Sequence, residues 1–145
     1  MEDELMLKIH ERDLDILART IYGEARGELN NPEGGMQSLQ AVGWVIKNRA
    51  KMLQFSPYIH KVCMQPWQFS CWNLNDPNRK SLLETSFEDK VYRACFLAAT
   101  RVLFDNTIDC TKGANHYHST NIAPPYWAVS KNPTVTIGHH IFYKL

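Results

Sequence analysis

A run of apolar residues at helical spacing ends beside a carboxylic acid near the start of this chain. Intervals of three and four residues separate Leu14, Leu17, Ala18, Ile21 and Ala25. Asp13 is a suitable N-cap and Gly27 a suitable stop, so the pattern predicts an amphipathic helix between them. Such a helix must pack its apolar stripe against other elements, which requires a folded domain with a hydrophobic core.

Glu24 lies at the edge of this stripe, roughly 70° from its centre on a helical wheel at about 100° per residue. Burial beside apolar residues disfavours the charged carboxylate and raises its pKa. A carboxyl group that is neutral at ordinary pH can donate a proton to a leaving group, as glycosidic-bond cleavage requires. The alternative at this point is a surface Glu that pairs with Arg26 or Arg19.

Composition describes an ordinary folded protein. The 145 residues are 44% hydrophobic and 21% charged, which suits one domain with a core. The formal net charge of +1 provides no strong field to attract nucleic acid. The N-terminus is acidic and lacks a signal-peptide pattern. We therefore expect synthesis in the cytoplasm without an export signal, no membrane span and no nucleic-acid partner.

Two further helices follow from the spacing of apolar residues. The first is predicted over residues 36–53. Residues 57–80 contain prolines and asparagines and are predicted as a long ordered loop, which is often a binding surface. Ser86, with Asp89 three residues later, resembles a capping box for another helix. The buried stripe expected on that helix is Val91, Ala94, Cys95, Ala98 and Val102.

The C-terminal part changes to short aromatic pieces. Residues 134–137 and 140–143 are strand-like runs on either side of Gly138. The chain is therefore predicted to be mainly α (an α+β domain) with a small β element near the C-terminus. Of its cysteines, Cys95 is expected in the core. Cys63 and Cys71 flank the aromatic loop and can bridge if oxidised, although reduced thiols are expected in a cytoplasmic product.

Five separated segments together resemble the cell-wall hydrolase family typified by spore-cortex-lytic enzymes. They are residues 17–28, 41–49, 65–72, 116–118 with 125–128, and 137–143. The resemblance covers residues 13–143 and implies a lysozyme-like, lytic-transglycosylase-like fold. It implies one catalytic domain of residues 1–145, with 1–12 as an N-terminal extension. Members of that family cleave peptidoglycan glycan strands as muramidases or lytic transglycosylases.

By position, the resemblance places the family's general acid on Glu24. Glu28 also matches, and we expect it to fix the loop after the helix by hydrogen bonding. Hydrolysis by a lysozyme-like route needs two carboxylates. Asp76, Glu84 and Asp105 occur in contexts typical of a loop, a cap region and a helix end. A lytic transglycosylase needs only one carboxylate, so this mechanism is favoured over a hydrolytic muramidase.

Glycan strands are bound by aromatic faces and side-chain amides, which the matched segments supply. The candidate substrate-binding residues are Glu28, Gln68, Phe69, Ser70, Trp72, His116, Tyr117, His118 and Trp127, and Trp67 lies in the same aromatic loop. For Phe69 and Trp44 a place in the core is the favoured alternative. For Tyr117 and Trp127, a place in a substrate-binding groove and a place in the core are equally favoured alternatives. Asn48 and Arg49 are expected to tie helices together.

A zinc-dependent wall amidase or peptidase is the rival enzyme. The imidazoles of His116, His118, His139 and His140 could bind a metal. Their spacing is loose and matches no H-E-x-x-H signature. We therefore predict no metal and no cofactor. A third alternative is a non-catalytic glycan-binding or tail-structural protein.

The expected partner is the peptidoglycan glycan strand, bound by a monomer. The short form without a signal peptide suggests a phage endolysin or virion-associated lysin that acts on the cell wall. A holin-like release protein would then be a further partner. A bacterial enzyme delivered by another route is the alternative origin.

Overall fold

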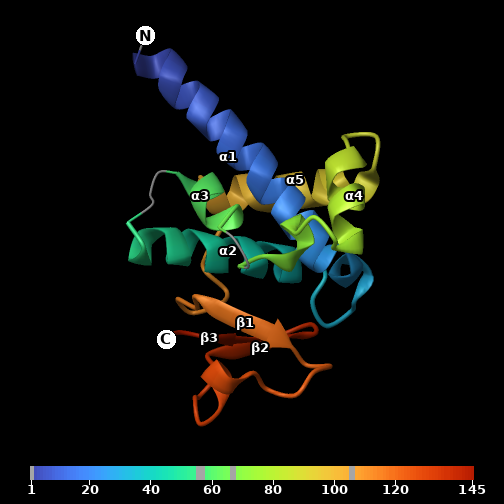
Figure 1. Ribbon diagram of the computed structural model, residues 1–145, viewed down its shortest axis with the longest axis vertical. Helices are drawn as coiled ribbons and strands as arrows, with labels where there is room; N and C mark the ends of the chain where they lie inside the picture. The colour runs from blue at the N-terminus through green and yellow to red at the C-terminus, as the bar shows by residue number, and fades with distance from the viewer. Residues whose placement is uncertain (1, 55–57, 66–67, 105–106) are drawn as a thin grey trace.

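The computed structural model describes residues 2–54, 58–65, 68–104 and 107–145. Helices form the N-terminal two thirds, and a small sheet follows along one side of them (Figure 1). In chain order, with 3-10 helices written η, the elements are α1 (Glu2–Ala25), η1 (Arg26–Asn30), α2 (Met36–Met52), α3 (Ile59–Cys63), η2 (Ser70–Trp72), α4 (Pro77–Glu84), α5 (Lys90–Leu103), β1 (His116–Ser119), η3 (Tyr126–Ala128), β2 (Val135–Ile137) and β3 (His140–Tyr143). The predicted class, mainly helical with a small C-terminal sheet, is confirmed. In the described part of the chain, no helix is both long and apolar enough to cross a membrane.

The core lies where α1, α2 and α5 pack together. The predicted stripes supply it, because Leu17 and Ile21 of α1 and Cys95 of α5 are fully buried. Trp44 of α2 is also buried, as favoured from the sequence. All four cysteines are free thiols. Cys63 is buried in this core, and burial raises its pKa to about 12. A thiol with so high a pKa stays protonated at neutral pH.

The first helix begins earlier than predicted. Residues 2–12, expected as an N-terminal extension, form the first turns of α1, which project beyond the other helices (Figure 1). Asp13 is therefore not the N-cap of its own helix. Its buried carboxylate accepts the backbone N–H groups of Ile59 (3.2 Å) and His60 (2.9 Å), and it contacts His60 Nδ1 at 2.6 Å. Asp13 thus satisfies the free N–H groups at the start of α3.

The prediction of one long loop over residues 57–80 is wrong. That region contains α3, η2 and the first turn of α4. These helices are too short to show helical periodicity in the sequence. One local signal was present, because Asp76 is followed by Pro77, a typical N-cap and first helical residue. The Asp76 carboxylate does accept the backbone N–H of Asn78 at 2.8 Å.

Asp89, rather than Ser86, caps α5. Its carboxylate accepts the backbone N–H of Val91 at 2.8 Å, and the helix begins at Lys90. Ser86 instead accepts the N–H of Glu88 at 3.4 Å in the preceding turn. The predicted capping box therefore identified the correct helix but placed its start three residues early.

The sheet is antiparallel with strand order β1-β3-β2. The predicted pair around Gly138 is confirmed as the β2–β3 hairpin. Gly138 has φ +56°, a backbone conformation that suits glycine, and a Cβ there would lie 2.5 Å from Glu28 Oε2. Strand β1 was not predicted, because His116–Ser119 is too polar to show strand alternation. It places Tyr117 opposite Phe142 of β3.

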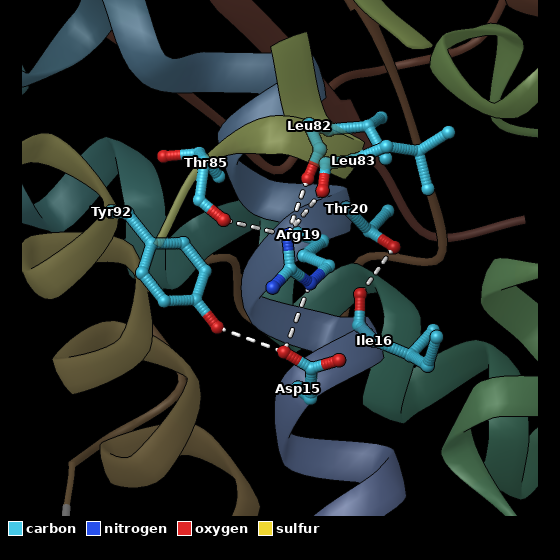
Figure 2. A network of polar contacts seen from close by, with 8 residues as sticks. All are labelled: Asp15, Ile16, Arg19, Thr20, Leu82, Leu83, Thr85 and Tyr92. Carbon is cyan, nitrogen blue, oxygen red and sulfur yellow. Dashed lines mark hydrogen bonds and ion pairs between the residues drawn. The ribbon is translucent and has the colours of Figure 1, made fainter. Parts of the chain in front are cut away.

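A polar network around Arg19 ties α1 to α4 and α5 (Figure 2). One guanidinium nitrogen donates to the carbonyls of Leu82 (2.6 Å) and Thr85 (3.0 Å) at the end of α4. Arg19 Nε donates to Asp15 at 2.9 Å, and the Tyr92 hydroxyl of α5 donates to the same carboxylate oxygen at 2.9 Å. Arg19 thus satisfies carbonyls that the end of a helix leaves unpaired.

Gly23, one residue before Glu24, lets α1 approach its neighbours closely. A Cβ at this position would lie 2.7 Å from Cys71 Cβ and 2.8 Å from Leu82 Cδ2. The absence of a side chain therefore sets how near η2 and α4 come to the last turn of α1.

We expect Gly23→Ala to lower the free energy of unfolding by about 1–3 kcal/mol, because a methyl group forced into a packed interior costs this much. Chemical denaturation followed by circular dichroism measures it. Gly27→Ala is the matched control, since a Cβ there would meet nothing within 4 Å. Equal stability of the two variants would contradict the close-packing argument.

Candidate active site

Glu24 lies in the last turn of α1, partly buried, and faces the sheet. The Tyr117 hydroxyl of β1 donates to Glu24 Oε1 at 3.0 Å, although the two residues are 93 positions apart. Within the described chain, no donor contacts Glu24 Oε2. The carboxyl group is thus held through one of its two oxygens.

The pKa of Glu24 is raised above its ordinary value. Burial is the main cause, and the negative charge of Asp76 adds to it. The hydrogen bond from Tyr117 and the positive charge of Arg49 act in the opposite direction. The net effect agrees with the raised pKa expected from the position of Glu24 on its helix.

Tyr117 remains a hydrogen-bond donor because burial, together with the charge of Glu24, raises its pKa well above 10. Its ring is partly buried and packs near His140 and Phe142, at centroid distances of 4.9 and 5.7 Å. This packing fixes the hydroxyl group in front of Glu24.

Arg49 of α2 was not predicted as a site residue. It is 7% exposed, and its Nε and Nη2 donate to the Asn115 carbonyl at 3.1 and 2.7 Å. Its Nη1 donates to Gln68 Oε1 at 3.3 Å, and the guanidinium lies over the Phe69 ring. Asn48 donates in the same way to the carbonyl of Ala114. The sequence led us to expect that Asn48 and Arg49 tie helices together. In the structure they instead connect α2 to the segment before β1.

A hollow of about 390 Å³ opens beside Tyr117. The residues that line it are Arg49, Gln68, His116, Tyr117, Tyr126 and Trp127. It therefore brings together four of the predicted substrate-binding residues from three separate parts of the chain. Tyr126, at 91% exposure, lies in the segment 125–128 singled out from the sequence, whereas Arg49 was missed. The mixture of aromatic faces with amide, imidazole and guanidinium groups is typical of a pocket that binds polar ligands.

Other predicted binding residues lie elsewhere. Phe69 is 2% exposed and belongs to the core. Trp72 packs against that core and donates its Nε1–H to Thr20 at 2.9 Å. Ser70 is exposed in η2, outside the residues that line the hollow. Trp67 lies outside the described residues.

Two of the C-terminal histidines, His118 and His116, each make separate polar contacts. His118 is buried, with Nδ1 2.9 Å from the Ser119 carbonyl and Nε2 2.9 Å from the Tyr143 hydroxyl. His116 Nδ1 contacts the side-chain oxygen of Asn115 at 2.8 Å. Over the described ranges, no three His, Cys, Asp or Glu residues are grouped so that they could hold a metal ion.

Glu28 connects η1 to the β2–β3 turn. It is 7% exposed; its Oε2 accepts from Asn31 at 2.9 Å and its Oε1 contacts His139 Nδ1 at 3.0 Å. Burial by itself raises the pKa of Glu28, but the hydrogen bonds from Asn31 and His139 outweigh it, so the pKa is lowered. Glu28 is therefore a charged group that holds the loop after α1. Its contact with substrate stays a prediction.

Among the other carboxylates considered from the sequence, Asp76 is the one whose charge acts on Glu24. Glu84 is the last residue of α4 and is exposed. Asp105 lies outside the described residues. Asp76 thus joins the site from the start of α4, although the sequence suggested only a loop.

Comparison with known proteins places this arrangement in a family. The Cell Wall Hydrolase family matches residues 31–143, which include Arg49, Tyr117 and the other residues that line the hollow. The chain belongs to this family. The matched residues begin after Glu24, so the family match by itself does not include the candidate acid.

Three individual proteins are similar to this Cell Wall Hydrolase family member. The spore cortex-lytic enzyme of Halalkalibacterium halodurans is 28% identical over 134 residues, which are 91% of this chain and 34% of that protein. The chain thus spans about a third of that relative's length. The catalytic domain of the Bacillus cereus SleB protein has a TM-score of 0.70 at 23% identity, over 92% of this chain and 91% of that chain. The catalytic domain of the germination-specific lytic transglycosylase SleB from Bacillus anthracis has a TM-score of 0.68 at 25% identity, over 91% and 93%.

We expect Tyr117→Phe to raise the pKa of Glu24 further. The Tyr117 hydroxyl stabilises the charged carboxylate, so its removal favours the neutral form. The measurement is a pH titration of the Glu24 carboxyl carbon by NMR in protein labelled with ¹³C-Glu. Tyr126→Phe is the control, because this exposed tyrosine lines the hollow and is not among the groups that act on Glu24. A Glu24 pKa that falls or does not change in Tyr117→Phe would contradict the role of this bond.

Proposed function

We propose that this protein cleaves the glycan strands of peptidoglycan as a lytic transglycosylase, with Glu24 as both acid and base. The observation that carries the proposal is a carboxyl group with raised pKa, held by Tyr117 beside an aromatic hollow. The family supports the substrate class. The similar Bacillus anthracis domain, which is named as a lytic transglycosylase, supports the reaction type.

In the first step, neutral Glu24 donates its proton to the glycosidic oxygen between N-acetylmuramic acid and N-acetylglucosamine. The bond from that oxygen to the anomeric carbon breaks, and positive charge develops on the muramoyl ring. In the second step, the Glu24 carboxylate takes the proton of the muramoyl 6-hydroxyl. The 6-oxygen then bonds to the anomeric carbon and closes a 1,6-anhydro ring. Glu24 is neutral again, and no water is consumed.

The bond from Tyr117 to Oε1 suits both steps. It directs the proton of neutral Glu24 to Oε2, the oxygen that no described donor contacts. In the hollow, Trp127 and Tyr126 offer faces for sugar rings, and Gln68 offers an amide for the acetamido and hydroxyl groups. Binding there would hold the sugar next to Glu24 and its reactive oxygen.

A hydrolytic muramidase is the second candidate, and the charge of Asp76 on Glu24 is the observation that favours it. Hydrolysis would need Asp76 to activate a water molecule or to bond the anomeric carbon. The Asp76 carboxylate is already used to cap α4, which favours the single-carboxylate reaction.

The place of action is a further proposal. We infer that the substrate is wall peptidoglycan, including spore cortex, because the Halalkalibacterium and Bacillus anthracis proteins are named for spore cortex and germination. These names give no support to the phage endolysin expected from the sequence, and a holin-like partner depends on that origin. Digestion of purified cortex peptidoglycan and of vegetative-wall peptidoglycan in parallel would show which of the two substrates the protein cleaves faster.

We expect Glu24→Gln to lose nearly all activity on purified peptidoglycan, at least about 10²-fold, because the amide cannot donate or take the proton. Mass spectrometry of the soluble products is the measurement. Wild-type protein should release muropeptides one water lighter than reducing muropeptides. Glu84→Gln is the control, since this exposed carboxylate at the end of α4 should be dispensable.

Reducing ends from the wild type would show a hydrolase and overturn the transglycosylase mechanism. Free stem peptides would show an amidase or peptidase. Equal activity of wild type and Glu24→Gln would remove Glu24 from the reaction. Binding to the wall without release of any fragments would favour a non-catalytic protein.

A further inference from the structure

Two polar side chains that line the hollow beside Tyr117, Gln68 and His116, are held in one orientation by the protein behind them. The hollow, at about 390 Å³, lies within the size range of small-ligand sites. Such sites select a ligand through a few polar groups of fixed orientation. The atoms that these two side chains leave unpaired therefore decide which group of a substrate fits the hollow.

Asn115 fixes the position of the proton on His116. The side-chain Nδ2 of Asn115 donates to the Leu145 carbonyl at 2.9 Å, and its Oδ1 accepts the Leu145 N–H at 3.0 Å. These two opposite bonds allow the amide one orientation, so the atom 2.8 Å from His116 Nδ1 is an oxygen. Because this oxygen can only accept, His116 Nδ1 carries the proton. In the neutral imidazole, Nε2 is then a hydrogen-bond acceptor.

The acceptor nitrogen of His116 is directed to the hollow. Burial and the positive charge of Arg49 lower the pKa of His116, so the imidazole is neutral at neutral pH. Asn115, on the Nδ1 side of the ring, is buried and does not line the hollow, so the opposite edge of the ring lines it. No group of the described chain contacts Nε2. The ring of Trp127, with its centroid 5.1 Å away, packs against the imidazole and holds it in place.

Arg49 fixes the amide of Gln68. A guanidinium group can only donate, so the Gln68 atom 3.3 Å from Arg49 Nη1 is the oxygen. Arg49 is itself held by two bonds to the Asn115 carbonyl. The N–H groups of Gln68 Nε2 have no partner among the described residues, and this side chain is exposed. The hollow thus presents one donor amide and one acceptor imidazole, both fixed from behind.

We propose that Gln68 and His116 are specificity-determining residues that recognise the 2-acetamido group of a sugar in the glycan strand. Gln68 Nε2 donates to the acetamido carbonyl, and His116 Nε2 accepts the acetamido N–H. This inference deepens the proposed function and rests on it. The aromatic faces of Trp127 and Tyr126 suit the methyl group. The acetamido group has one acceptor and one donor next to each other, which complements this pair.

The same arrangement disfavours a sugar without its acetyl group. An N-deacetylated sugar carries an ammonium group, which has no carbonyl oxygen for Gln68. Its positive charge would enter a hollow that contains Arg49 and that no described carboxylate lines. We therefore infer that the protein distinguishes N-acetylated from N-deacetylated glycan strands. Both N-acetylglucosamine and N-acetylmuramic acid carry the acetamido group, so either sugar can supply it.

The first test is binding of peptide-free glycan fragments of peptidoglycan to Glu24→Gln, measured by isothermal titration calorimetry. N-acetylated fragments should bind at least about tenfold more tightly than the same fragments after N-deacetylation, because polar groups left unpaired in the hollow cost affinity. Re-acetylation should restore binding. Fragments deacetylated only on glucosaminyl or only on muramoyl residues show which sugar occupies the hollow. Equal affinity for acetylated and fully deacetylated fragments would overturn the inference.

Gln68→Glu, in the same Glu24→Gln background, tests the donor. It retains an oxygen for Arg49 and replaces the free N–H groups by a carboxylate oxygen, so deacetylated fragments should now bind more tightly than acetylated ones. Gln40→Glu is the matched control, since Gln40 also accepts from an arginine, Arg101 Nη1 at 3.2 Å, but does not line the hollow. An unchanged preference in folded Gln68→Glu, or the same reversal in Gln40→Glu, would contradict the proposal.

Two variants of His116 test the acceptor. His116→Asn retains a donor near Asn115 but has no atom at the position of Nε2, so the preference for acetylated fragments should weaken. His116→Gln places an amide oxygen near that position and should retain more of it. In the wild type, ¹⁵N NMR of the imidazole at neutral pH should show a protonated Nδ1 and an unprotonated Nε2. A proton on Nε2 would overturn the role of His116.

Binding and the imidazole spectrum need no turnover, so failure of the inference can be distinguished from failure of the proposed function. A preference for acetylated fragments, with reducing ends from wild-type digestion, would retain the acetamido site and reject the transglycosylase. Anhydro products from the wild type, with equal binding of acetylated and deacetylated fragments, would retain the function and reject the acetamido site.

Discussion

The hydrogen bond from Tyr117 to Glu24 is the contact on which the candidate site depends, because it joins the helical part of the molecule to the sheet at the proposed acid. Glu24 lies in the last turn of α1, whose apolar stripe is fixed in the core, and Tyr117 belongs to β1. A shift of the sheet relative to α1 would break this bond. The position of the sheet thus decides what Glu24 contacts.

Polar contacts and a small apolar cluster together set that position. Arg49 and Asn48 of α2 donate to backbone carbonyls just before β1, and Glu28 contacts His139 in the β2–β3 turn. Behind the sheet, Val45 of α2 packs with a group of buried residues, Ala41, Ala114, Ile137 and Phe142. Since most of these contacts are directional, they fix the register of the strands against the helices more sharply than apolar packing alone would.

The sequence by itself determined the elements whose signals are local. The helical stripes around Leu17 and Cys95, the hairpin at Gly138 and the edge position of Glu24 each depend on residues within a few turns of one another. A rule of local spacing or turn geometry is enough to find them. The same rules placed the start of α5 at Ser86 instead of Asp89, because both residues are good caps and only the backbone geometry distinguishes them.

Only the tertiary structure decided which side chains serve distant elements. Asp13 is a good N-cap by sequence, yet it caps α3 some 46 residues away while its own helix continues to Glu2. Arg49 and Asp76 act on Glu24 from α2 and α4 with no local signal for either role. The physical reason is that charge and hydrogen bonding act through space. Residue type and spacing therefore predict that a group needs a partner, but only packing determines which partner it finds.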